Sequence, residues 1–139
     1  MVLVDTSVLI SFLQGQVNSK TKLLEGVFSR GIPFGISAYT YQEILQGARD
    51  DKEYGQLREY LSTQKIYYLP ERADTYEKAA KLYFNLRRKG VTPRSTIDIL
   101  IALTAMENRL MLLHNDRDFE AMIEKTDGLW NYEVPQNRL

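Results

Sequence analysis

The sequence contains no cysteine and a single histidine, His114, among its 139 residues. Without thiols, the chain has no disulfide, no cysteine nucleophile, and no iron–sulfur or cysteine-based zinc site. A single imidazole also excludes a metal site built from several histidines. Any metal that the protein binds must therefore have oxygen ligands, which favours magnesium, manganese or calcium.

The chain also lacks an excess of charge of either sign, since it has 18 basic and 18 acidic residues. A protein that coats nucleic acid without selectivity is normally basic, so this balance argues against that class but not against a nucleic-acid enzyme. No apolar stretch reaches the length of a membrane helix. The apolar N-terminus has no basic residues before it and is interrupted by Asp5, so we expect no secretory signal, no membrane association and a cytoplasmic location.

Short apolar segments alternate with longer amphipathic ones along the chain. The segments that read as strands are 2–5, 34–37, 65–70, 109–114 and 129–134. The segments that read as helices are 7–14, 20–31, 39–48, 50–64, 73–90, 97–109 and 118–126. Strands separated by helices need crossover connections. We therefore predict a single α/β domain over residues 1–139, with a central, mostly parallel sheet of four to five strands flanked by helices.

Acidic residues lie at or near the ends of three of these strands. Asp5 ends the first strand, and Asp116 and Asp118 follow the fourth. Glu43 lies about one turn into the helix after the second strand, and Asp98 begins a helix that is otherwise apolar. Ligands of open α/β sheets bind outside the carboxyl ends of the strands. The pattern predicts a site at that edge.

Most of these acids also have a purely structural explanation. Asp5 is a favoured N-cap for the helix that follows it. Glu43 fits the last position of a capping box that begins at Thr40. Asp116 and Asp118 fit turn and cap positions before the next helix, and for Asp118 this explanation is the preferred one.

Asp98 fits its structural explanation least well. It would lie in the first turn of a helix capped by Ser95 or Thr96, where the helix dipole favours an anion. Its isoleucine and leucine neighbours, however, draw it toward the interior, where an unpaired carboxylate is costly. Asp98 therefore needs a cation or several hydrogen-bond donors.

The acids taken together indicate a metal. Several carboxylates at one sheet edge repel one another, and without a cation some of them would take up protons. Magnesium typically binds one or two carboxylates and leaves places for phosphate oxygens, and a second ion would complete a clamp for in-line displacement at phosphorus. The cluster predicts metal-assisted hydrolysis of phosphodiesters, with one or two ions.

Four segments of the sequence resemble the motifs of one family. They are VLVDTSVLI with Asp5, YTYQEIL with Glu43, DILIALTA with Asp98, and HNDRDF with Asp116. In size, order of elements and motif spacing, the whole chain resembles a PIN-domain ribonuclease of the VapC type, the toxin of a toxin–antitoxin system. The last two motifs, at their spacing, are the most specific part of the resemblance.

The resemblance implies a catalytic set of acids that binds Mg²⁺ or Mn²⁺, formed by Asp5, Glu43, Asp98 and Asp116. It implies supporting roles for Thr6, Asn115 and Asp118. It also implies an RNA substrate, a VapB-type antitoxin that crosses the acidic groove, and a homodimer. One position departs from the family, because His114 stands where Thr or Ser is usual. We interpret His114 as a strand-end residue without a catalytic role.

Basic residues just before the Asp98 helix are candidates for RNA contacts. They are Arg87, Arg88 and Arg94. The alternative is equally well supported, because Lys and Arg near the end of a helix complement its dipole, and Gly90 fits the end of that helix.

Two other α/β classes fit the sequence less well. A phosphatase of the haloacid-dehalogenase type needs an acid two residues after its nucleophilic aspartate, where this chain has Ser7. A receiver domain needs paired acids after its first strand. The remaining alternative is a non-catalytic PIN-like domain that binds RNA or protein. Because the chain has all four acids, we favour a metal-dependent endoribonuclease.

Overall fold

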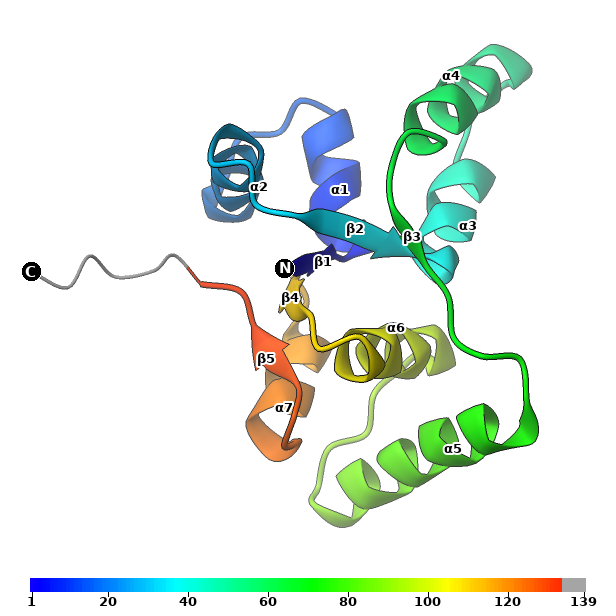
Figure 1. Ribbon diagram of the computed structural model, residues 1–139, viewed down its shortest axis with the longest axis vertical. Helices are drawn as coiled ribbons and strands as arrows, with labels where there is room; N and C mark the ends of the chain where they lie inside the picture. The colour runs from blue at the N-terminus through cyan, green and yellow to red at the C-terminus, as the bar shows by residue number, and fades with distance from the viewer. Residues whose placement is uncertain (134–139) are drawn as a thin grey trace, which may run out of the picture.

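The computed structural model describes residues 1–133 (Figure 1). In this part of the chain, five strands form one sheet in the order β3-β2-β1-β4-β5. The strands are β1 Val2–Val4, β2 Phe34–Ser37, β3 Ile66–Tyr67, β4 Met111–Leu113 and β5 Trp130–Asn131. All four pairings are parallel, which confirms the predicted α/β sheet. Val134, the last residue of the expected fifth strand, lies outside the described residues.

Helices cover both faces of the sheet (Figure 1). They are α1 Thr6–Leu13, α2 Ser19–Ser29, α3 Ala38–Gln46, α4 Asp51–Leu61, α5 Ala73–Arg88, α6 Thr96–Glu107 and α7 Arg117–Lys125. Helices α1 to α4 pack on one face, and α5 to α7 pack on the other. None of these helices is long and apolar enough to cross a membrane.

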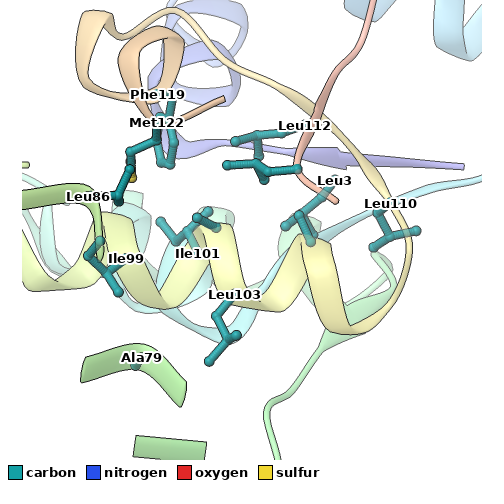
Figure 2. Packing of buried hydrophobic residues seen from close by; sticks show 13 residues of the cluster. Leu3, Ala79, Leu86, Ile99, Ile101, Leu103, Leu110, Leu112, Phe119 and Met122 are labelled. Atoms are coloured by element: carbon teal, nitrogen blue, oxygen red, sulfur yellow. The ribbon is translucent and has the colours of Figure 1, made fainter. Parts of the chain in front are cut away.

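The sheet separates two apolar cores. Side chains of a strand alternate between its faces, so Val2 and Val4 of β1 join the core beneath α1 to α4, while Leu3 joins the other. Figure 2 shows the core around Leu3, in which α6 lies between the sheet and α5. In this view Leu103 points from α6 toward Ala79 of α5. Because both sides of α6 are covered, apolar residues occupy nearly its whole circumference.

The sheet order places the expected site residues close together. The central strand β1 pairs with β2 on one side and with β4 on the other. Immediately beyond β1, the backbone N–H of Asp5 donates to the carbonyl oxygen of Leu113 at 2.9 Å. The carboxyl ends of β1 and β4 are therefore adjacent, and the residues that leave these two strands meet at the same edge.

Candidate active site

Asp5 lies at the exit of β1 and is the N-cap of α1, as expected. Its Oδ2 accepts hydrogen bonds from the Ser7 hydroxyl at 2.6 Å and from the Ser7 backbone N–H at 3.1 Å. The residue is only 3% exposed. Burial raises the pKa of Asp5 above its ordinary value; the Ser7 hydrogen bonds oppose this shift, and the nearby charge of Glu43 adds to it. Asp5 is therefore both the N-cap of α1 and one of the candidate site acids.

Glu43 projects from α3 toward the start of α1. Its Oε1 accepts a hydrogen bond from the Thr6 hydroxyl at 2.7 Å. The predicted capping box is wrong, because Ser37 is the N-cap of α3 and accepts from the backbone N–H of Thr40 at 3.0 Å. Helix α3 begins at Ala38, directly after its Ser37 cap, whereas a capping box from Thr40 to Glu43 requires Thr40 to precede the helix. Glu43 therefore interacts with α1, and not with its own helix start.

Asp98 lies in the first turn of α6, as expected, and Ser95 is the N-cap of that helix. Within residues 1–133, the Asp98 side chain accepts no hydrogen bond, although it is half-buried. The pKa of Asp98 is raised to about 7, chiefly by desolvation and further by the charges of Asp5, Asp116, Glu43 and Asp118. The tertiary structure therefore places five carboxylates near one another, and the negative charges of the other four favour the protonated form of Asp98.

Asp116 and Asp118 have different local partners. Asp116 is the N-cap of α7, and its Oδ1 accepts from the Asp118 backbone N–H at 2.9 Å. The cap preferred for Asp118 is therefore wrong, because the helix already begins at Arg117. Asp118 instead accepts two hydrogen bonds from Arg94, from the backbone N–H at 3.1 Å and from Nε at 3.2 Å.

Ser7 is a site residue that the sequence interpretation missed. Its hydroxyl donates to Asp5 and accepts a hydrogen bond from the Asn115 backbone N–H at 3.0 Å. Asn115 thus contributes its backbone, and its side chain is exposed. The sequence could have indicated this role. Asp5 is a favoured N-cap, and a hydroxyl at the N2 position, here Ser7, lies close to the N-cap side chain.

His114 is fully buried at the end of β4. Its ring packs against Phe119, with 5.4 Å between ring centroids, and its Nδ1 accepts from the Asp116 backbone N–H at 3.2 Å. Burial lowers the pKa of His114, which favours the neutral imidazole. The geometry gives His114 a local structural contact with the residue that caps α7.

The three candidate arginines have two different environments in the structure. Arg87 and Arg88 end α5 and lie near aromatic rings of the same helix, at 5.9 Å from the Tyr83 centroid and 5.6 Å from the Phe84 centroid. Arg94 is instead attached to the acidic edge through Asp118. The expected end of α5 is confirmed, because Gly90 has a φ of 85°, which glycine adopts without strain.

The donor set of this edge fits an oxygen-preferring divalent ion in charge and chemistry, because it contains five carboxylates and the one histidine is buried behind them. Across residues 1–133, however, no three acidic or imidazole side chains are already arranged to hold a common ion. Side-chain rotation is therefore required for three of them to bind one ion. Magnesium tolerates an incomplete set of protein ligands, because it usually keeps several waters.

The parallel sheet with an acidic edge defines an α/β domain whose site lies at the carboxyl ends of its strands. A family model described as the PIN domain matches residues 2–125. The chain therefore belongs to the PIN-domain family, as its motifs indicated. VapC ribonuclease Mb1587 of Mycobacterium bovis is 27% identical over 128 residues, 91% of this chain and 95% of that protein. Ribonuclease VapC11 of Mycobacterium tuberculosis matches equally.

Solved structures share this fold. VapBC2 from Rickettsia felis, bound to a promoter DNA fragment, matches 95% of this chain and 98% of its own chain, with a TM-score of 0.71 and 17% identity. A toxin–antitoxin complex from Klebsiella pneumoniae matches 96% of this chain and 100% of its own chain, with a TM-score of 0.67 and 25% identity. The overlap extends over nearly the whole domain in both cases.

Proposed function

We propose that this protein is a metal-dependent endoribonuclease and the toxin of a type II toxin–antitoxin pair. The observation that carries this proposal is the charge at the carboxyl edge of the sheet. Asp98 has no hydrogen-bond donor within the described chain, and its pKa is raised to about 7 by desolvation and further by the charges of four other carboxylates. A divalent cation would relieve this repulsion and give the cluster a chemical use.

The acids that we assign to Mg²⁺ or Mn²⁺ are Asp5, Glu43, Asp98 and Asp116. When bound, the ion would supply an acidified water and stabilise charge on a phosphate. Two hydroxyl groups orient the carboxylates of this set. Thr6 holds Glu43, and Ser7 holds Asp5, so two carboxylates are prevented from turning away from the edge. Such fixed positioning is a main source of rate in phosphoryl transfer.

The assignment of RNA as substrate is supported by the two curated relatives, both of which are named as ribonucleases. A VapB-type antitoxin as partner is supported by the solved relatives, one a VapBC pair and the other a toxin–antitoxin complex. The homodimer remains a proposal from the family resemblance. Because the chain has no cysteine and one histidine, we assign the acids as its metal ligands.

The proposal is tested by cleavage of total RNA with the purified protein. Parallel reactions contain Mg²⁺, Mn²⁺ or excess chelator, with Asp98→Asn as the variant and Asp51→Asn as the control. Asp51 is an exposed acid in the first turn of α4, outside the cluster. We expect discrete products from the wild type and the control only when metal is present, and none from Asp98→Asn.

A non-catalytic PIN-like domain that binds RNA or protein gives a different result. Such a domain would retain RNA in a binding assay while producing no cleavage with either metal. Equal cleavage by wild type and Asp98→Asn would point to a contaminating nuclease and contradict the assignment of the site. Products formed in excess chelator would contradict the metal requirement.

A further inference from the structure

We propose that Arg94 binds the phosphate that is cleaved, and that Asp118 acts by holding Arg94 rather than by binding metal. This inference rests on the proposed ribonuclease function and assigns two residues within it. Arg94 belongs to the loop between α5 and α6, and Asp118 lies in the first turn of α7. The pair therefore joins two elements that are distant in sequence, at the edge where the carboxylates meet.

Asp118 has its charge satisfied by Arg94 alone. A single oxygen, Oδ2, accepts from both the backbone N–H and the Nε of Arg94, at 3.1 and 3.2 Å. Asp98, by contrast, accepts no hydrogen bond within residues 1–133. Arg94 is therefore hydrogen bonded to Asp118 and not to Asp98.

The attachment leaves the outer edge of the guanidinium available. Within residues 1–133, the Arg94 side chain hydrogen bonds through Nε, and its two terminal nitrogens make no hydrogen bond. Nη2 lies 4.0 Å from Asp116 Oδ1, so this edge lies beside the proposed metal-binding acids. The side chain is 80% exposed and open to a ligand from solvent. Two N–H groups of a guanidinium match two oxygens of a phosphate.

A comparison with Arg49 shows why this geometry is informative. Arg49 is equally exposed, at 85%, and also pairs with an acid, but it uses both Nε and Nη2 on Glu53 Oε2, at 3.0 and 2.8 Å. This pair is an ordinary contact four residues apart, of the kind that contributes little to stability. Arg94 instead hydrogen bonds only through the inner nitrogen, with Nη2 in a longer ion pair with Asp116 at 4.0 Å, and Asp118 also accepts from its backbone. The arrangement orients the guanidinium and leaves the N–H groups of its terminal nitrogens without a hydrogen bond within the described residues.

The test compares Arg94→Ala, Arg94→Lys, Asp118→Asn and the double variant Arg94→Ala/Asp118→Asn, with Arg49→Ala as the matched control. The substrate is a synthetic RNA that spans one site cleaved by the wild type. The measurements are kcat and KM, and Mn²⁺ binding by calorimetry without RNA. Since phosphate charge develops in the reaction, we expect Arg94→Ala to lower kcat about 100-fold with little change in KM. Arg94→Lys should recover only a small part.

The proposal also determines what the other variants and the metal-binding measurements should show. Asp118→Asn should lower kcat, and the double variant should be no slower than Arg94→Ala, because both changes remove the same oriented group. Arg94→Ala should not weaken Mn²⁺ binding. Asp118→Asn should weaken it far less than Asp98→Asn does. Arg49→Ala should match the wild type in every measurement.

Several outcomes would overturn the assignment. They are wild-type kcat in Arg94→Ala, a change confined to KM, full recovery by Arg94→Lys, or a loss of Mn²⁺ binding in Asp118→Asn equal to that in Asp98→Asn. If Arg94→Ala lowers the melting temperature, Arg94→Lys decides the question, because it keeps a positive charge beside Asp118. Absence of cleavage by the wild type would reject the proposed function itself, whereas cleavage by wild type and Arg94→Ala alike would reject only this inference.

Discussion

Ser7 and Asp5 are joined by two hydrogen bonds to the same carboxylate oxygen, one from the Ser7 hydroxyl at 2.6 Å and one from its backbone N–H at 3.1 Å. The same hydroxyl accepts from the Asn115 backbone N–H across the sheet edge. One serine therefore connects the exits of β1 and β4. This relationship determines how Asp5 is oriented, because a buried carboxylate keeps the rotamer in which its hydrogen bonds are satisfied.

Replacement of Ser7 by alanine removes the hydroxyl and leaves the backbone N–H as the remaining Ser7 donor to Asp5. We expect the free energy of unfolding to fall by about 1–3 kcal/mol, because the buried Asp5 carboxylate loses a hydrogen-bond donor and the Asn115 N–H loses its acceptor. Cleavage should fall as well. Chemical denaturation and RNA cleavage measure the two effects. Ser11→Ala is the control, because Ser11 bonds only the carbonyl of Ser7 within the helix. Equal behaviour of the two variants would contradict the role of Ser7.

Replacement of Thr6 by valine tests the orientation of Glu43. Valine has nearly the same shape but no hydroxyl, so Glu43 loses its donor at 2.7 Å. We expect weaker Mn²⁺ binding and slower cleavage, with a small change in stability because Glu43 is partly exposed to water. Thr6→Ser keeps the hydroxyl and should restore both properties. If serine and valine have the same effect, the methyl packing and not the hydrogen bond is what matters.

The raised pKa of Asp98 predicts a pH-dependent stability. The folded carboxyl holds its proton up to about pH 7, whereas the unfolded one loses it near pH 4. The folded state therefore binds more protons between these values, and the unfolding free energy of the metal-free protein should decrease as the pH rises through this range. Melting temperatures in excess chelator at pH 5 and pH 8 measure this change.

Asp98→Asn provides the control for that experiment. Removing the charge should raise the melting temperature of the metal-free protein at pH 8 and reduce its dependence on pH, although we expect the same change to abolish cleavage. Metal must displace the proton of Asp98, so Mn²⁺ affinity of the wild type should increase with pH and level off above about 7. A stability curve in which wild type and Asp98→Asn run parallel would contradict the pKa shift.

An RNA contact by Arg88 would appear in the salt dependence of binding. Each phosphate contact releases counterions, so Arg88→Ala should reduce the slope of log K against log salt by about 1. Arg58→Ala is the control, since Arg58 is an exposed residue of α4. Filter binding in chelator, which prevents cleavage, gives the slopes. An unchanged slope would leave Arg88 with the structural role of completing the end of α5.

The packing of α6 predicts a large stability difference within one helix. Ile101 is 1% exposed and belongs to the core beneath the sheet, so Ile101→Ala should cost about 2–5 kcal/mol. Leu100 is only partly buried, and Leu100→Ala should cost clearly less. Urea unfolding of both variants compares the two positions. Similar costs would contradict the difference in burial between the two positions.

The sequence was sufficient for the class of fold and for the gathering of the acids near one another at one edge of the sheet. Alternation of apolar strands with amphipathic helices predicts crossovers, and the observed sheet is parallel throughout. Gly90 was expected to end α5, and Ser95 was one of the two expected caps of α6; both are observed. These features depend on local periodicity and local backbone preference, which are encoded within a few neighbouring residues.

The sequence could not identify the partners of the acids. Glu43 appeared to be a capping residue for its own helix, but Thr6, at a separation of 37 positions, is its donor. Asp118 appeared to be a helix cap, but it accepts a hydrogen bond from Arg94, which lies in the loop before α6. In each case the neighbouring residues allowed a local explanation, but a contact between distant elements was formed instead.

What the sequence by itself determined is therefore the alternating order of elements, the oxygen-only chemistry of any metal site, and the placement of acids after strands. What only the tertiary structure decided is which charges are compensated. Asp118 lies against Arg94, and Asp98 lies among four other carboxylates. The physical reason is that the energy of a charge depends on its burial and on neighbours brought close by the sheet order, and neither quantity is a property of the residues adjacent in sequence.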